Sequence, residues 1–253
     1  MELILRNQQT EVFDSLQRFN VLLAHRRFGK TVLAVAILLH IAQMKQQQGL
    51  RRPQVHYYAP SYPQAKRVAW PYVKDFLHGC GAQFNESELK AELPGGAILQ
   101  LGSGENPDSS RGIYSDYVVL DEPSQMPTRL WTEVLRPALS DRLGGAMFIG
   151  TPQGRHGLFY DTYQDAADDP LWWRGCYRAS ETGIVDEEEL HAAQRAMSRA
   201  EYLQEFECDW SAAIQGAYWG ERMNEIEEKG QLTRLAHDPA KLVHTGWDLG
   251  LSD

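Results

Sequence analysis

Short apolar runs alternate with longer amphipathic stretches through the first 150 residues of the chain. Four runs have the length and composition of buried strands: 20–24, 55–59, 117–120 and 146–150. Helical patterns lie around and between them: 7–18, the residues after Thr31, 63–78 with Pro71 as a kink, and 128–142. Strands and helices that alternate in this way predict an α/β fold, with a mainly parallel, doubly wound sheet flanked by helices.

Two further stretches complete the pattern. The segment 88–101 alternates around Pro94-Gly95-Gly96 and predicts a hairpin. From about residue 180 the chain becomes acidic and helical, and a new apolar run begins near 241. We therefore expect a core over 1–180, a small helical subdomain over 181–238, and the first strand of another domain over 239–253.

Composition is that of an ordinary globular chain, with 43% hydrophobic and 23% charged residues. The three cysteines show no C-x-x-C spacing, and no signal peptide or membrane-spanning run is present, so we expect a reducing cytoplasmic location without a membrane. The net charge of −9 argues against non-specific coating of DNA. Residues 1–56 nevertheless hold eight Lys and Arg against three acids, which leaves a local phosphate-contacting surface open.

A candidate phosphate-binding loop follows the first apolar run directly. Its residues are His25, Arg26, Arg27, Phe28, Gly29, Lys30 and Thr31. Between a strand and a helix, its amides and the helix N-terminus would hold the phosphates of ATP, Lys30 would reach the β and γ oxygens, and Thr31 would bind Mg²⁺. Ala24 stands where the generic pattern has a glycine, so an ordinary strand–helix turn with an exposed lysine stays open.

The run 117–120 ends on Asp121 and Glu122. A hydrophobic strand tipped by two acids suits an NTPase in which Asp121 holds Mg²⁺ and Glu122 orients or deprotonates the attacking water. No N-K-x-D sequence occurs in the chain, which disfavours a GTPase. The run 146–150 would lie parallel to the acid-tipped strand and place the Thr151 hydroxyl near the γ-phosphate, although a plain Thr-Pro turn explains that residue too.

Several motifs, in order along the chain, resemble the ATPase portion of a large terminase subunit, the family of motors that package tailed-phage DNA. Arg26 stands four residues before Lys30, as in the phosphate loop of that family. Leu5-Arg6-Asn7-Gln8-Gln9 is similar to the context of its adenine-reading glutamine, which would be Gln9. Three further segments resemble motifs of that family. Ser110-Arg111-Gly112 resembles its R-G segment, residues 150–154 resemble its coupling motif, and residues 202–210 resemble the stretch at the end of its ATPase region.

The resemblance implies a RecA-like P-loop NTPase fold of the additional-strand catalytic-glutamate type, with a small helical lid or linker subdomain. It also implies an ATP- and Mg²⁺-dependent motor that moves double-stranded DNA into a procapsid in the cytoplasm of a bacterial host. The partners implied are the portal protein, the small terminase subunit and further copies in a ring. Glu122, Arg26, Arg111 and Thr151 would be catalytic, with Arg111 acting either between subunits or as a DNA contact.

The same resemblance extends to Asp248, in Trp247-Asp248-Leu249-Gly250. It matches the metal-binding aspartate that ends the first strand of a ribonuclease-H-like nuclease. Two-metal hydrolysis needs several convergent carboxylates, so nuclease activity is expected only in a longer chain. Two other hypotheses remain: a RecA-like helicase or translocase, which the sequence Asp121-Glu122-Pro123-Ser124 disfavours, and a nucleotide-binding assembly protein whose site has lapsed at Ala24.

Overall fold

The computed structural model describes residues 4–211, 222, 226 and 229–231. The chain divides into two compact units, residues 1–214 and 215–253. The first contains every helix and strand considered below. The predicted segment 239–253 and most of residues 212–238 of the predicted helical subdomain lie outside the described residues.

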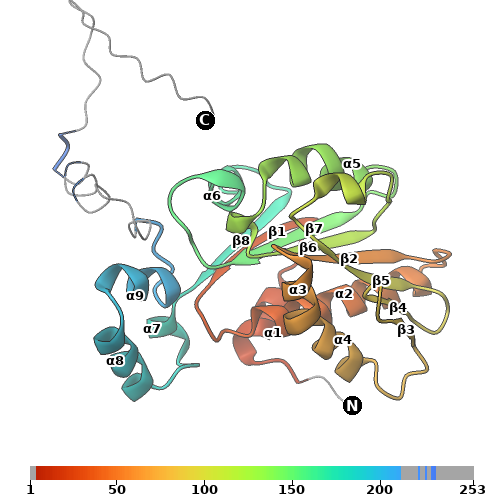
Figure 1. Ribbon diagram of the computed structural model, residues 1–253, viewed down its shortest axis with the longest axis horizontal. Coiled ribbons are helices and arrows are strands. Elements are labelled where there is room, and N and C mark those ends of the chain that lie inside the picture. Colours follow the sequence, from red (N-terminus) through yellow and green to blue (C-terminus); the bar gives the residue numbers. More distant parts are fainter. Residues whose placement is uncertain (1–3, 212–221, 223–225, 227–228, 232–253) are drawn as a thin grey trace, which may run out of the picture. The chain divides into compact units, whose positions relative to one another are not determined.

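One eight-stranded sheet forms the centre of the first unit, in the order β3-β4-β5-β2-β6-β7-β1-β8 (Figure 1). The strands are β1 (Phe19–Ala24), β2 (Gln54–Ala59), β3 (Gln83–Asn85), β4 (Lys90–Glu92), β5 (Ile98–Ser103), β6 (Tyr117–Asp121), β7 (Gly145–Gly150) and β8 (Trp172–Tyr177). The six strands from β5 to β8 in this order are parallel, and β3-β4-β5 is antiparallel. The mainly parallel sheet and the hairpin around Pro94 are thus confirmed.

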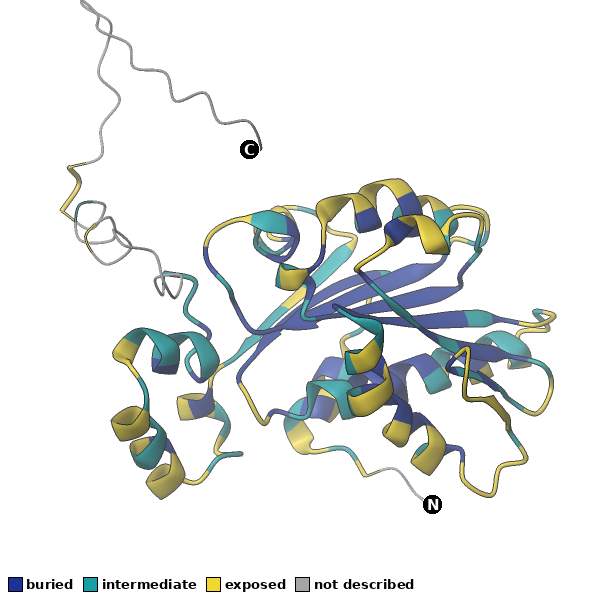
Figure 2. Cartoon of the chain, in the orientation of Figure 1, coloured by how far each residue is buried: buried dark blue, intermediate teal, exposed yellow. Residues whose placement is uncertain are grey.

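Strand β7 lies between β1 and β6, so one additional strand separates the candidate phosphate loop from the acid-tipped strand. All residues of β1, β6 and β7 are buried, because helices cover both faces of the sheet (Figure 2). Buried parallel strands read as continuous apolar runs, which is why the sequence located these three.

The helices lie in two layers (Figure 1). One layer comprises α1 (Asn7–Asp14), α2 (Lys30–Gln47) and the segment from α3 (Tyr62–Gln64) through α4 (Trp70–Phe76). The other comprises η4 (Leu130–Leu135), α5 (Arg136–Ala138) and α6 (Gly157–Asp165). Alternate residues of each strand face alternate layers: Val119 packs with the first and Val118 with the second.

Two stretches predicted as single helices contain π-helical segments. Residues 63–78 include η1 (Ala65–Ala69) before α4, and residues 128–142 include η4 before α5. Pro71 and Pro137 each lie at the start of the α-helix that follows. Proline has no N–H for the i→i−4 bond and crowds the preceding turn, so the helix widens there instead of continuing as α.

The apolar pattern did not reveal strand β8 at one edge of the sheet. Its residues are all half-buried except exposed Arg174, and its partner is β1 on one side only. Trp172 stacks on Phe19 and also contacts Phe148. No strand was predicted over these residues, and it forms because β1 offers it a free edge.

The acidic region after residue 180 is helical, as predicted. Its helices are α7 (Ala179–Thr182), α8 (Glu187–Ala196) and α9 (Arg199–Glu205). They share a small core of Ala179, Leu190, Tyr202 and Phe206. Asp186 caps α8 by accepting a hydrogen bond from Glu188 N, and the acids that follow lie in the first turn, where the helix dipole favours them.

None of the helices in the described part of the chain is long and apolar enough to cross a membrane.

His56, in β2, provides a test of the packing at the centre of the sheet. Its side chain is buried, Nδ1 hydrogen-bonds with Ser115 Oγ at 2.8 Å, and burial lowers its pKa from 6.5 to about 4. The unfolded chain therefore binds more protons between these values, and stability falls as the pH falls. Between pH 7 and pH 5 the free energy of unfolding should drop by about 2 kcal/mol more than in His56→Asn.

The measurement is urea unfolding of both proteins at each pH. Other titrating groups affect both proteins alike, so equal pH slopes would show that His56 is not held neutral.

Candidate nucleotide-binding site

The predicted phosphate loop is a tight turn between β1 and α2. The turn ends at Gly29, directly before Lys30, and the φ of Gly29 is +93°. This φ favours glycine, and a Cβ at Gly29 would also lie 2.5 Å from Gln9 Nε2 and displace that side chain. The turn leaves the first amides of the 18-residue helix α2 unpaired within the helix, where an anion is favoured.

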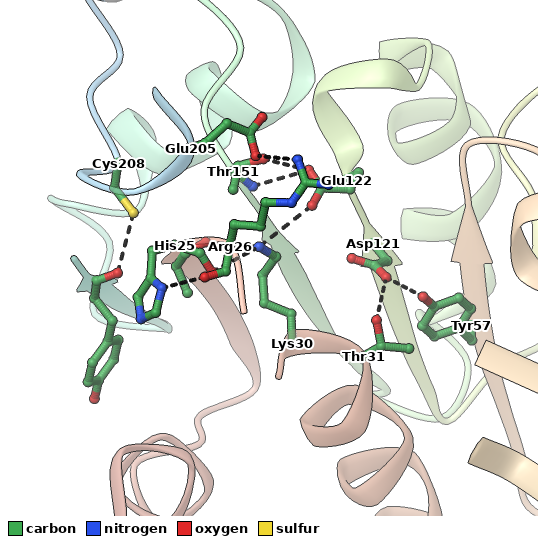
Figure 3. Close-up of polar contacts among 12 residues, drawn as sticks. His25, Arg26, Lys30, Thr31, Tyr57, Asp121, Glu122, Thr151, Glu205 and Cys208 are labelled. Carbon is green, nitrogen blue, oxygen red and sulfur yellow. Dashed lines mark hydrogen bonds and ion pairs between the residues drawn. The ribbon is translucent and has the colours of Figure 1, made fainter. Parts of the chain in front are cut away.

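Lys30 extends from the start of α2 along the loop (Figure 3). Its Nζ donates to Ala24 O at 2.9 Å and lies 3.7 Å from Glu122 Oε1. The side chains of this ion pair are 11% and 19% exposed, so solvent screens it only weakly. The structure thus brings together the lysine of the loop and the second acid of β6, as the sequence predicted.

Asp121 is buried at the end of β6 and is held by two hydroxyl groups (Figure 3). Its Oδ2 accepts hydrogen bonds from Thr31 Oγ1 at 3.4 Å and from Tyr57 OH. Burial raises the pKa of Asp121, while the Tyr57 bond and the charge of Lys30 act against that shift. A buried carboxylate beside a threonine hydroxyl offers the oxygen ligands that Mg²⁺ takes.

Sequence reasoning missed Tyr57. It lies on β2, next to β6, in register with Val119 and therefore on the face that Asp121 shares. Strand adjacency is a property of the sheet order, which the chain order of β2 and β6 does not reveal. The available signal was the tyrosine in a buried run, where its hydroxyl needs a partner.

Glu122 follows β6 with φ of 56°, in the left-handed region. Its Oε2 accepts hydrogen bonds from Thr151 N at 3.1 Å and from Thr151 Oγ1 at 3.2 Å. A Cβ at Gly150 would lie 3.0 Å from that oxygen, so Gly150 provides the space for the carboxylate. Burial, with the charge of Asp121 added, raises the pKa of Glu122 to about 7, and Lys30 opposes this rise.

Residues at the carboxyl ends of β1, β6 and β7 therefore converge, as ligand sites do in open α/β sheets. They combine a helix N-terminus, one lysine, the buried carboxylate of Asp121 and the half-buried carboxylate of Glu122. Among the described residues no three His, Cys, Asp or Glu side chains gather to hold a metal ion. A cation at Asp121 would need further oxygens, which phosphate groups on the loop can supply.

Residues 21–228 match the family model "Terminase large subunit, T4likevirus-type, N-terminal". The chain belongs to the large terminase subunit family. The large terminase subunit of Escherichia phage T5 is 27% identical over 254 residues, which is 95% of this chain and 55% of that protein. This terminase chain thus spans about half the length of that curated relative.

Solved terminases share the fold. The large terminase ATPase domain of Thermus phage P74-26 aligns with a TM-score of 0.65 at 20% identity, over 82% of this chain and 94% of that domain. The large terminase of a second thermophilic bacteriophage, in complex with ATP-gamma-S, aligns with a TM-score of 0.63 at 16% identity, over 77% of this chain and 48% of that one. The predicted RecA-like P-loop fold is thereby confirmed.

Arg26 of this terminase points toward helix α9. Its backbone N donates to Glu205 O at 2.8 Å, and its Nη1 lies 3.6 Å from Glu205 Oε2. His25 is buried, and its Nε2 hydrogen-bonds with Thr182 Oγ1 at 2.9 Å. Glu205 and Thr182 had no sequence signal, because the contacts join segments more than 150 residues apart.

The other predicted loop residues take different places. Phe28 is buried against Tyr177, whereas Arg27 is exposed with φ of 73°. Gln9 is buried and binds the loop backbone, with Nε2 donating to Phe28 O at 3.2 Å and to Gly29 O at 3.1 Å. The predicted adenine-reading residue therefore lies against the phosphate loop.

Arg111 lies on the loop between β5 and β6, and its side chain is about half exposed. Its guanidinium binds Asp108 and, at 3.0 Å, Glu133 of η4. Gly112 beside it has φ of +82°. Asp248, the predicted nuclease ligand, lies outside the described residues.

Asp121→Asn tests whether the ionised carboxylate of Asp121 lowers the free energy of unfolding. Because burial raises the pKa of Asp121, its ionised form opposes folding once the pH exceeds the unfolded pKa of 3.8. At pH 7 the variant should gain about 0.5–2 kcal/mol in free energy of unfolding, a gain that shrinks as the pH falls toward 4.

Exposed Asp168→Asn is the matched control and should change stability by less than about 0.5 kcal/mol. A loss of stability in Asp121→Asn, measured by denaturant unfolding, would contradict this account.

Proposed function

We propose that this chain hydrolyses ATP to drive the movement of double-stranded DNA into a procapsid. The observation that carries the proposal is the convergence of Lys30, Thr31, Asp121 and Glu122 at the carboxyl ends of β1 and β6. The large terminase of the second thermophilic bacteriophage, which has this fold, binds ATP-gamma-S, and this supports ATP as the nucleotide.

The residues present fit MgATP. The amides of the loop and of the first turn of α2 would bind phosphate oxygens, and Lys30 would exchange its bond to Ala24 O for them. Thr31 and Asp121 would hold Mg²⁺, and the raised pKa of Asp121 indicates a carboxylate that gains from a cation. The ion would neutralise charge on the transferred phosphoryl group.

Glu122 would orient the attacking water and take its proton. Its pKa of about 7 suits a general base at neutral pH. Thr151 holds the carboxylate through two hydrogen bonds, so Thr151 would act by positioning Glu122 and by sensing the γ-phosphate from the end of β7.

Arg26 would stabilise charge on the γ-phosphate from within the same subunit. In the structure its guanidinium contacts Glu205, so reaching the phosphate requires that this exposed ion pair be broken, which costs little. Gln9 would contact adenine while it braces the turn at Gly29.

The wider role rests on the family. We infer that the partners are double-stranded DNA, the portal protein, the small terminase subunit and further copies in a ring, in the cytoplasm of a bacterial host. In a longer chain Asp248 would belong to a metal-dependent nuclease domain. Residues 1–180 would be the ATPase core, 181–238 a lid or linker and 239–253 the first nuclease strand.

Lys30→Ala should abolish ATP turnover, and Glu122→Gln should keep ATP bound without turnover. Losing the lysine removes a charge-assisted contact worth about 1.5–3 kcal/mol in binding. Losing the base lowers the rate by about 10²–10⁴-fold while leaving the phosphate contacts. Phosphate release and binding of a fluorescent ATP analogue measure the two effects.

Lys45→Ala, near the other end of α2, is the matched control and should retain wild-type turnover. Turnover in Lys30→Ala at the wild-type rate would overturn the site. Absent turnover in the wild type under assembly conditions would favour a lapsed nucleotide-binding scaffold.

We also propose that Arg111 acts in trans, on the ATP of a neighbouring subunit. Mixing Arg111→Ala with Lys30→Ala subunits should then restore part of the ATPase activity, because an intact arginine can face an intact loop. An arginine supplied in trans is worth about 10³–10⁵ in turnover, so the signal should be clear.

Lys30→Ala mixed with Glu122→Gln is the control, since both changes damage the same side of the site. No recovery with Arg111→Ala, under conditions where wild-type subunits assemble, would leave Arg111 as a DNA or structural contact.

A further inference from the structure

Two of the three cysteines meet at the base of the α7–α9 helices. Cys176 lies on β8, and Cys208 follows the end of α9. Both pack in the same cluster on one face of the sheet, and Tyr177, the residue after Cys176, is a direct contact of Cys208. Cys208 Sγ also donates to Tyr177 O at 3.3 Å, which fixes it beside the strand (Figure 3). The third cysteine, Cys80, is exposed and lies in the turn after α4.

The surroundings of Cys176 favour its thiolate. The hydrogen bond from Cys208, the charge of Arg178 and a hydrogen bond with Tyr163 lower its pKa to about 7, against burial and the charge of Glu181. At pH 7 such a thiol is roughly half ionised, over tenfold more than an ordinary thiol of pKa about 8.5. The pKa of Cys208 is raised by the same bond and by burial. Cys176 is also the more exposed of the two thiols, so a reagent in solution reaches it first.

A small reagent can approach the pair. Cys176 is only half-buried. Cys208 lines a cavity of about 500 Å³ together with Arg178, Tyr160 and Trp210. A reactive thiolate, an adjacent second thiol and a neighbouring cavity are the features of a redox-sensing cysteine pair.

We propose that Cys176 and Cys208 form a reversible disulfide pair that small-molecule disulfides oxidise. The Cys176 thiolate attacks one sulfur of the reagent, forms a mixed disulfide and expels a thiolate. The Cys208 thiol then loses its proton and attacks the Cys176 sulfur, which expels the second thiolate of the reagent. The two cysteines are oxidised to one disulfide, and the reagent is reduced to two thiols.

The Cys176–Cys208 disulfide would link the two ends of the segment that contains the three helices. Residues 177–207, which include all of α7, α8 and α9, lie between the two sulfurs. Glu205, the partner of Arg26 in the phosphate loop, lies three residues before Cys208. Oxidation would therefore restrain the helical segment that contacts the loop, as a transient disulfide does in a reducing compartment.

The test is peptide mapping of the reduced chain after treatment with oxidised glutathione at pH 7. We expect a Cys176–Cys208 disulfide to form before Cys80 is modified, and dithiothreitol to reverse it. In Cys208→Ser the resolving thiol is absent, so glutathione should remain attached at Cys176. In Cys176→Ser no glutathione should reach Cys208 in that time, and Cys80→Ser should behave as the wild type.

Circular dichroism of each variant verifies the fold. Modification of Cys80 ahead of Cys176, or glutathione retained on Cys176 in the wild type without closure onto Cys208, would overturn the proposal. The readout is chemical and involves no nucleotide, so its outcome is independent of the proposed ATPase activity.

Discussion

Asp121 and Glu122 are consecutive carboxylates, one buried and one half-buried, and residues from several neighbouring segments hold them in place. Burial raises the pKa of both, which means that their ionised forms are poorly compensated. Lys30 supplies one positive charge, and hydroxyl or amide groups of Tyr57 and Thr151 supply hydrogen bonds. A fold selected only for stability has no need of this pair, so its presence indicates a functional site.

The order of the strands makes that arrangement possible. Tyr57 comes from β2 and Thr151 from β7, the two neighbours of β6, and Lys30 comes from the helix that follows β1. Asp121 ends β6 and Thr151 directly follows β7, so both lie at the carboxyl edge of the sheet, and Tyr57 contacts Asp121 from within β2. The donors to the two acids therefore come from three segments without any long loop, and buried strands fix their positions.

The phosphate loop is also tied to the α7–α9 helices. His25 hydrogen-bonds with Thr182, Arg26 contacts Glu205, and Cys208 binds the carbonyl of Tyr177, which also accepts from His25 N. Short polar contacts thus connect the loop directly to these helices. Asp121 and Glu122 face the same loop through Lys30, so the acids and the helices meet at one turn of the chain.

The sequence by itself determined those strands and loops whose conformation depends on residues adjacent in the chain. Continuous apolar runs predicted β1, β6 and β7, the residues Gly29-Lys30-Thr31 predicted the loop, and Asp121-Glu122 predicted the acids. These features could be predicted because burial on both faces of a sheet and turn formation each depend on consecutive residues. Tertiary structure decided the rest. Strand β8 exists because β1 has a free edge. The contacts of Tyr57, of Glu205 and of the Cys176–Cys208 pair are all with residues distant in the chain. Which side chains meet across neighbouring strands depends on the order of strands in the sheet, and no local sequence pattern encodes that order.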